Sequence, residues 1–334
     1  MTGDSGSAGS AGPPGAAGRV GPFDRLLHLG NVVVDVVLTV PALPEPGGDV
    51  LATSTETTAG GGFNVMAAAC RQGLPVAYAG AIGSGPFAEV ARAACAAEGI
   101  EVLQPAKPGV DTGFVISIVD GAGERTFLTS RGAEATLTGA DLELVRPGPG
   151  DAVYLSGYGL VHPANRAALL GWLGRLDDRH IVIFDPGPLV LSLPRDALDM
   201  ALGRADWLTC NTREAALLTG ARDPLRALAL LTRSSGRAGV LVRTGPDGCL
   251  LGHRGGPARQ VPGFRVTAVD TNGAGDTHTG VFLAALADGA DDAEAVRRAN
   301  AAAALSVTKP GPATGPTRAE LADFLASRQA GPGR

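Results

Sequence analysis

The sequence has few cysteines, and they are widely spaced. Its four cysteines, Cys70, Cys95, Cys210 and Cys249, stand singly, so no metal-binding or redox spacing occurs. We therefore predict reduced, buried thiols and a cytoplasmic location. The first residues do not combine a charged segment with an apolar core, so a signal peptide is not expected.

Long runs of one kind of side chain are also missing. The 28 Lys and Arg residues are scattered and the formal net charge is −5, which disfavours nucleic acid and anionic membranes as partners. No apolar segment reaches the roughly 18 residues that a membrane-spanning helix needs.

What is present is an ordinary globular composition in a chain of 334 residues, with 45% hydrophobic and 18% charged residues. Residues 1–22 are nearly all Gly, Ser, Ala and Pro and predict a disordered tail, and residues 329–334 predict a second flexible tail. One domain is therefore expected over residues 23–328.

Short apolar segments alternate with helix-like segments along this domain. Such alternation predicts an α/β fold in three layers, with a mostly parallel central sheet covered by helices on both faces. The predicted strands are 26–40, 76–80, 152–155, 181–184, 207–210, 240–243 and 264–268. The predicted helices are 64–73, 87–99, 164–176, 213–219, 224–232, 277–286 and 293–307.

Two segments interrupt the alternation with strands that no helix separates. Residues 50–58 are rich in Thr and Ser, and residues 112–119 and 124–129 flank Asp-Gly-Ala-Gly, which is typical of a hairpin turn. We predict a small β-sheet lid from about 36–58 and 110–130. Its open edges would be hidden if two copies paired, so a homodimer through the lid is expected.

Residues 270–276 read Asp-Thr-Asn-Gly-Ala-Gly-Asp and lie between an apolar stretch and a helix-like run. Small residues before a helix let a ligand approach the free N–H groups of the first turn, which favour phosphate. Asp276 would then be placed to take a proton from an attacking hydroxyl. The alternative is a tight connection whose aspartate only caps the helix.

Residues 60–64 read Gly-Gly-Gly-Phe-Asn and form a second glycine cluster at a helix start. They predict a place where a polyol lies against the backbone and Asn64 binds its hydroxyls. Asp35 ends an apolar stretch, where an unpartnered carboxylate is costly to bury, and is a further hydroxyl acceptor. The alternative for residues 60–64 is a turn with an asparagine cap.

In this order the clusters resemble the ribokinase-like (PfkB) carbohydrate kinase family over residues 24–328. Asn-Thr-Arg-Glu at 211–214, Arg-Thr-Gly-Pro-Asp-Gly at 243–248 and the segment from Ala299 to Gly311 fit further motifs of that family. The resemblance implies the family's three-layer αβα domain with a small β lid, and an ATP-dependent kinase.

The resemblance also implies roles for matching residues. Asp276 would be the catalytic base, beside an anion hole formed by Gly273, Ala274 and Gly275. Four residues would hold the substrate hydroxyls: Asp35, Gly60, Gly62 and Asn64. Five residues would line the ATP site: Asn211, Thr244, Gly245, Gly248 and Asn300. Asn211 and Glu214 would organise Mg²⁺ through water.

Many relatives hold a monovalent cation such as K⁺ beside the anion hole. The matching positions are Asp270, Asn272, Ser306, Lys309, Gly311 and Gly315. An ammonium group from Lys309 in the cleft would make the ion unnecessary, so both alternatives stand.

The expected reaction transfers the γ-phosphate of ATP to a hydroxyl, preferably a primary alcohol, of an unphosphorylated sugar or polyol. Relatives that act on phosphorylated sugars often carry a lysine where Gly61 and Gly62 stand, although Arg125 and Arg131 could supply a cation from the lid.

Three alternatives stand beside an unphosphorylated sugar. A nucleoside kinase would stack a base on Phe63 or Tyr158. A phosphosugar kinase is less favoured because no lysine stands at Gly61 or Gly62, and a catalytically silent regulator is less favoured because the base and the anion hole are both present. His278, usually an aromatic residue in relatives, is expected to be a packed neutral imidazole.

Overall fold

A computed structural model describes residues 23–234 and 238–329. The predicted tails at 1–22 and 330–334 lie outside the described residues. Helix α11 (Arg318–Gln329) extends one residue into the segment predicted as the second tail. No helix within the described ranges is long and apolar enough to cross a membrane.

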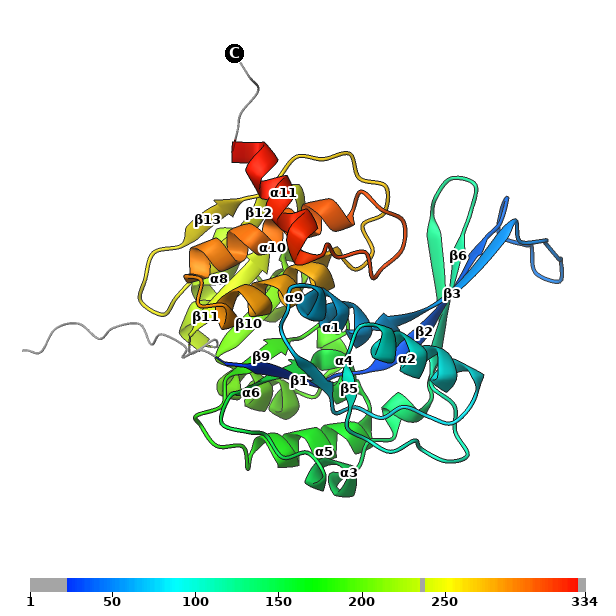
Figure 1. Ribbon diagram of the computed structural model, residues 1–334, viewed down its shortest axis with the longest axis horizontal. Coiled ribbons are helices and arrows are strands. Elements are labelled where there is room, and N and C mark those ends of the chain that lie inside the picture. The colour runs from blue at the N-terminus through cyan, green and yellow to red at the C-terminus, as the bar shows by residue number, and fades with distance from the viewer. Residues whose placement is uncertain (1–22, 235–237, 330–334) are drawn as a thin grey trace, which may run out of the picture.

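A nine-stranded sheet forms the centre of the molecule, in the order β13-β12-β11-β10-β9-β8-β1-β4-β5 (Figure 1). The first seven strands in the chain that belong to it run parallel, and β12 and β13 join as antiparallel neighbours at one edge. The strands are β1 (Arg25–Leu29), β4 (Val76–Tyr78), β5 (Glu101–Val102), β8 (Asp151–Ser156), β9 (Val182–Asp185), β10 (Trp207–Asn211), β11 (Gly239–Arg243), β12 (Gly248–Gly252) and β13 (Arg259–Pro262).

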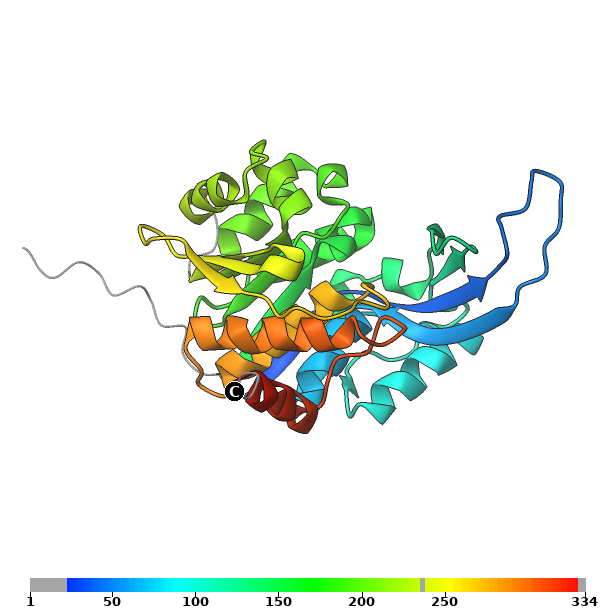
Figure 2. The ribbon, with the colours of Figure 1, turned by 90° about the horizontal axis from the view of Figure 1, so that it is seen from above.

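Helices cover both faces of this sheet, as Figure 2 shows from above. One face packs against α1 (Gly62–Arg71), α2 (Pro86–Ala97), α9 (Ala274–Ala287) and α10 (Asp292–Ser306), with α11 packed outside α10. The other face packs against α3 (Gly139–Glu143), α4 (Gly157–Val161), α5 (Pro163–Leu173), α6 (Arg195–Arg204), α7 (Thr212–Thr219) and α8 (Pro224–Ser234). The predicted three layers are confirmed. Strands buried on both faces need apolar side chains in succession, which explains the short apolar runs of the sequence.

A separate four-stranded sheet forms the predicted lid, in the order β3-β2-β6-β7. Its strands are β2 (Val32–Thr39), β3 (Ser54–Gly61), β6 (Phe114–Val119) and β7 (Arg125–Ser130). The last two form the hairpin expected around residues 120–123. Because β2 follows β1 directly, the lid joins the central sheet close to the ends of its strands.

Two strand predictions are wrong, the first in part and the second entirely. The strand predicted at 26–40 breaks at Gly30, where the chain leaves the central sheet as β1 and enters the lid as β2. A Cβ atom at Gly30 would lie 2.4 Å from Cε1 of His28, so the chain passes there only without a side chain.

The segment 264–268 is irregular rather than a strand. Phe264 packs on Phe324 of α11, with ring centroids 5.5 Å apart, and Val269 is 65% exposed. The backbone N–H of Val269 donates to the carbonyl of Val307 after α10 (2.7 Å). The segment therefore crosses over the end of α10 instead of entering the sheet.

Candidate active site

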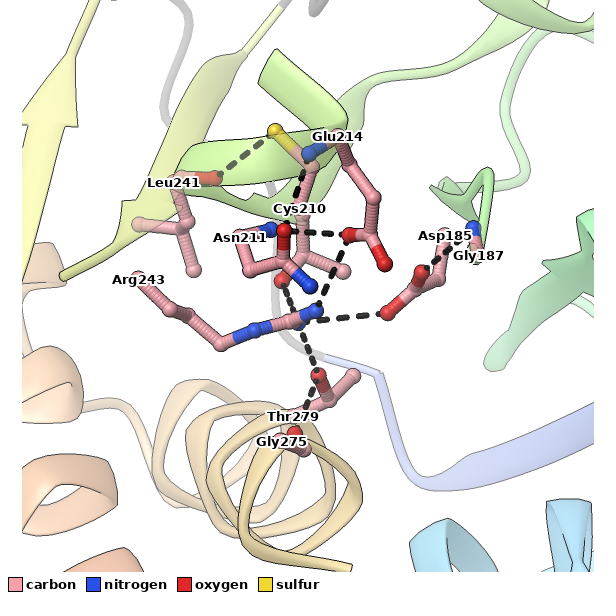
Figure 3. A network of polar contacts seen from close by, with 10 residues as sticks. Asp185, Gly187, Cys210, Asn211, Glu214, Leu241, Arg243, Gly275 and Thr279 are labelled. Carbon is pink, nitrogen blue, oxygen red and sulfur yellow. Dashed lines mark hydrogen bonds and ion pairs between the residues drawn. The ribbon is translucent and has the colours of Figure 1, made fainter. Parts of the chain in front are cut away.

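Three polar side chains end neighbouring parallel strands at one edge of the central sheet. Asp185 ends β9, Asn211 ends β10 and Arg243 ends β11. In open α/β sheets, ligands bind beyond the carboxyl ends of the strands. Helix α9 begins at the same edge, so the polar ends of three strands and the start of one helix lie together there, as the close view in Figure 3 shows.

Small residues form the start of α9, where the anion hole is expected. Gly273 precedes the helix with a left-handed φ of 71°, and a Cβ atom there would lie 1.9 Å from the carbonyl oxygen of Pro312. Only glycine satisfies both constraints. The first N–H groups of a helix lack intrahelical acceptors, and the small residues Ala274 and Gly275 leave them open to a ligand.

Asp276 lies in the first turn of α9 and meets Asn64 from α1. The Asn64 Nδ2 group donates to Asp276 Oδ2 at 3.1 Å, although the two residues are 212 positions apart in sequence. The amide thus fixes one carboxylate oxygen and joins the two predicted glycine clusters. The other oxygen remains to accept a proton.

Burial raises the pKa of Asp276 to about 6. Asp185 and Asp35 raise it further, because like charges disfavour a second ionised carboxylate, while Asn64 and Arg243 oppose the rise. The balance leaves Asp276 ionised at pH 8 and basic enough to attract the proton of a hydroxyl.

The glycines of the first cluster are explained by the protein's own side chains. A Cβ atom at Gly60 would lie 2.1 Å from Asp35 Oδ2, and one at Gly62 would lie 2.3 Å from Cε1 of His28. Burial raises the pKa of Asp35 to about 6. The structure therefore places Asp35, Gly60, Gly62 and Asn64 together, with the glycines making room for a carboxylate and an imidazole.

A cavity of about 650 Å³ also borders the α9 start, and its lining does not include Asp35, Asn64 or Asp276. Four residues predicted for the nucleotide line it: Asn211, Gly245, Gly248 and Asn300. Thr244 lies between them in the chain, and its hydroxyl is buried without a partner within the described part of the chain. The irregular segment 264–268, predicted as a strand, forms part of the wall.

Asn300 and His278 form a buried pair behind this cavity. Asn300 Nδ2 donates to the carbonyls of Val261 (3.0 Å) and Pro262 (3.1 Å), and its Oδ1 lies 3.1 Å from His278 Nε2. Burial lowers the pKa of His278 to about 3, so the imidazole is neutral. This agrees with the packed imidazole predicted for His278 and gives Asn300 a structural partner on α9.

Arg243 is a residue of this site that the sequence interpretation did not single out. Figure 3 shows its guanidinium at the centre of a polar network beside the α9 start. Its Nη1 donates to Asp185 Oδ2 (3.2 Å), Thr209 Oγ1 (2.6 Å) and Thr279 Oγ1 (3.1 Å). Its Nη2 lies 3.6 Å from Glu214 Oε2.

The position of Arg243 relates it to the anion hole. A Cβ atom at Gly275 would lie 3.5 Å from Arg243 Nε, so the guanidinium stem lies directly against the first turn of α9. Asp185 and Glu214 raise the pKa of Arg243 well above its usual range, even though burial opposes the charge. A permanent positive charge therefore underlies the turn that would receive a phosphoryl group.

Asn211 and Glu214 are reciprocally bonded at the start of α7. Asn211 Oδ1 accepts from the Glu214 backbone N–H (2.9 Å), and Glu214 Oε2 accepts from the Asn211 backbone N–H (2.8 Å). In residues 23–234 and 238–329, no group of three His, Cys, Asp or Glu side chains is arranged to hold a metal alone. The donors fit a Mg²⁺ ion that arrives with nucleotide phosphates and keeps most of its waters.

The six residues expected around a monovalent cation lie in the loop before α9 and in the segment that runs from Ser306, the last residue of α10, into the following loop. The Gly311 backbone N–H donates to Asp270 Oδ2 at 3.0 Å and joins the loops. Lys309 does not reach the cleft, because its Nζ donates to Glu320 Oε1 at 3.1 Å on α11.

Comparison with known proteins agrees with this geometry. Residues 24–319 match the family described as pfkB family carbohydrate kinase. A protein of Escherichia coli described as an uncharacterized sugar kinase is 33% identical over 301 residues, covering 89% of this chain and 92% of its own. A ribokinase of Haemophilus influenzae is 31% identical over 314 residues, covering 90% and 98%.

Solved structures share the fold at lower identity. A structure of a protein described as a ribokinase II from E. coli, in complex with ATP and Mg²⁺, has a TM-score of 0.79 and 22% identity, covering 91% of this chain and 100% of its own. Aminoimidazole riboside kinase from Salmonella enterica, with aminoimidazole riboside and an ATP analogue, has a TM-score of 0.75 and 24% identity, covering 90% and 99%.

Proposed function

The chain belongs to the pfkB family of carbohydrate kinases, and we propose that it transfers the γ-phosphate of ATP to a hydroxyl of an unphosphorylated sugar or polyol. The pairing of Asp276 with Asn64 at the α9 start carries the proposal. Asp276 would take the hydroxyl proton, and the N–H groups around Gly273, Ala274 and Gly275 would stabilise charge on the transferred phosphoryl group. A primary alcohol is proposed as the acceptor because it is the least hindered.

The charges on the sugar side favour a substrate without a phosphate. Asp35 is half-buried and its pKa is raised, a change that a nearby cation would oppose. The guanidinium of Arg125, one of two lid arginines that could bind a phosphate, lies 2.7 Å from Asp270 instead. A dianionic phosphate beside Asp35 would meet repulsion without compensation.

The cavity on the other side of α9 supports ATP as the donor. Its volume of about 650 Å³ suits a mononucleotide, and Asn211, Gly245 and Gly248 line it. The E. coli structure with ATP and Mg²⁺ shares this fold. Mg²⁺ would be held near Asn211 and Glu214 through water and would neutralise phosphate charge when bound.

A screen for ADP release tests the proposal. The intact protein is incubated with ATP and Mg²⁺ and with single sugars, polyols, nucleosides and sugar phosphates, and ADP is followed by a coupled assay. We expect the fastest turnover with an unphosphorylated sugar or polyol. Turnover only with sugar phosphates would contradict the substrate class, and no ADP with any compound would favour the silent regulator.

A nucleoside remains the second candidate, on one observation. Tyr158 is 41% exposed, and its ring lies against Gly187 after β9, where a Cβ atom would be 3.5 Å from Tyr158 Cε2. Burial raises the pKa of Tyr158 to about 12, with Asp276 and Asp185 contributing, so this ring lies at the acidic end of the cleft. A base could stack there, and the riboside kinase of S. enterica shares the fold.

The raised pKa of Asp276 predicts the acid limb of the pH profile. A base must be deprotonated, so kcat/KM should be constant above about pH 7 and fall tenfold per pH unit well below the pKa of about 6. The neighbouring charged groups are Asp185, Asp35 and Arg243, and removing Asp35 should shift the limb to lower pH. Initial rates from pH 5 to 8.5 measure this, and a rate independent of pH would contradict Asp276 as the base.

The lid supports the proposal of a homodimer. Its outer strands are β3 and β7, and β7 carries two exposed apolar side chains, Phe127 (55% exposed) and Leu128 (58% exposed). Pairing of lid edges would satisfy the free backbone groups of β7 and reduce the exposure of these side chains. We predict a dimer by light scattering at micromolar concentration, converted toward monomer by Phe127→Glu. A monomer at every concentration would contradict it.

Residues 23–328 are proposed as the catalytic unit.

A further inference from the structure

The lid contacts the loop before the anion hole through an ion pair. Arg125 begins β7, and its Nη2 lies 2.7 Å from Asp270 Oδ2. In Figure 1 the hairpin that begins with β6 rises beside the loops before α9 and after α10. The Arg125 side chain is 30% exposed and that of Asp270 is 8% exposed, so the pair is largely shielded from water.

Both carboxylate oxygens of Asp270 have partners. Oδ1 accepts from the Asn272 backbone N–H at 2.9 Å, and Oδ2 accepts from the Gly311 backbone N–H at 3.0 Å as well as from Arg125. Burial alone would raise the pKa of Asp270, but the guanidinium and the two N–H groups lower it below its usual value. Asp270 is therefore a charged group whose charge is already balanced.

The other residues expected around a monovalent cation do not fit one. The carbonyl of Ser306 accepts from Thr314 Oγ1 at 3.0 Å, and that hydroxyl lies 3.4 Å from the Gly311 carbonyl. The carbonyl of Gly315 accepts from Arg71 Nη1 at 2.9 Å. A cation needs several oxygens turned toward it. Here Asp270 Oδ2 already accepts from Arg125, and the carbonyls of Ser306 and Gly315 already accept from protein donors that would compete with an ion.

The ion pair also helps to hold the turn at Gly273, where the anion hole is expected, in position. Asp270 lies three residues before Gly273, and the Gly311 N–H that it accepts lies next to Pro312, whose carbonyl is packed against Gly273. A shift of Asp270 would therefore move the turn that presents the N–H groups of Gly273 and Gly275. Catalytic geometry of this kind is sensitive to displacements of about 1 Å.

We propose that the guanidinium of Arg125 takes the place of a monovalent cation beside the anion hole, so that this kinase works without K⁺. The positive charge comes from the lid. Asp270 and the turn at Gly273 are therefore held in place only while the β6–β7 hairpin keeps Arg125 beside Asp270. Arg125 is a positioning residue, since it acts through Asp270. The inference rests on the proposed kinase function for its kinetic test, but not for its binding test.

The binding test uses thermal unfolding of the protein without ATP or sugar. K⁺ is titrated against tetramethylammonium at constant ionic strength. A bound ion stabilises only the folded state, so the Tm of a cation-binding protein rises with K⁺. We expect no K⁺-specific rise for the native protein and a rise for Arg125→Ala, in which Asp270 has lost its cation. A K⁺-specific rise in the native protein would overturn the proposal.

The kinetic test repeats the titration with an accepted sugar. We expect no K⁺ activation of the native protein, a fall in kcat of about tenfold or more for Arg125→Ala, and partial rescue of that variant by K⁺. Arg125→Lys should retain most of kcat without K⁺, because it keeps the charge. Arg131→Ala, at the other end of the hairpin, is the matched control and should behave as the native protein. Saturable K⁺ activation of the native protein, or a normal kcat for Arg125→Ala, would overturn the proposal.

Discussion

Asp276→Asn should lose turnover by about 10²- to 10⁴-fold while ATP still binds. The variant removes the group that accepts the hydroxyl proton and leaves the first N–H groups of α9 in place. Its amide oxygen can still accept from Asn64, so the 3.1 Å contact between α9 and α1 need not be lost. Initial rates with the best sugar, together with calorimetric titration of ATP, measure both effects.

The stability of the same variant gives an independent check. The folded-state pKa of Asp276 is raised to about 6, so above that pH its ionised form opposes folding. Asp276→Asn should therefore unfold at the same or a higher temperature than the native protein at pH 8, and the difference should shrink toward pH 5. Asp288→Asn, at the other end of α9, is the control and should keep native turnover. Near-native turnover of Asp276→Asn would remove Asp276 as the base.

The sequence predicts the strands that are covered by helices on both faces of the sheet. Strands such as β9, β10 and β11 carry successive apolar residues, and each lies within one residue of its expected bounds. The segment 264–268 shows the limit of this signal. It contains apolar residues, but they face the nucleotide cavity and α11, and periodicity alone does not distinguish these environments from a sheet.

The two glycine clusters were identified from local sequence, but their contact was not. Asn64 and Asp276 lie on different helices, and only the packing of α1 against α9 brings the amide to the carboxylate. A second reason for Gly60 and Gly62 was not available from the sequence. A substrate lying against the backbone was expected to need them, and Asp35 and His28 also lie where their Cβ atoms would be.

Arg243 could have been identified by an argument applied to Asp35. Both residues are charged and follow an apolar run, where burial without a partner is costly, although Asp35 lies within β2 whereas Arg243 ends β11. The pattern Gly-Val-Leu-Val-Arg at 239–243 therefore demands buried acids nearby. Their identity was not available from sequence, because Asp185 ends β9 and Glu214 lies in the first turn of α7.

Arg243→Met should have the largest effect on stability, about 3–5 kcal/mol, because it leaves Asp185 and Glu214 as buried acids without a cation. Unpaired buried carboxylates have raised pKa values in the folded state. The loss should therefore be small near pH 5, where they can be protonated, and should grow toward pH 8. Urea unfolding at both pH values measures it, with Arg213→Met, an exposed arginine on α7, as the control.

A second variant separates charge from geometry at the same position. Arg243→Lys keeps the positive charge between the two acids but cannot donate to Asp185, Thr209 and Thr279 at once. It should recover much of the stability lost in Arg243→Met. Its turnover should still fall, by about tenfold or more, because the guanidinium stem no longer supports the turn at Gly275.

Adding Asp185→Asn to Arg243→Met should restore part of the stability at pH 8, since one of the two unpaired charges is removed. The size of that recovery measures how strongly Asp185 and Arg243 interact in the native protein. If Arg243→Met were as stable as the native protein at pH 8, the network in Figure 3 would not hold the strand ends together. If Arg243→Lys kept full turnover, a charge alone would suffice beneath the anion hole, and the fork of the guanidinium would be dispensable.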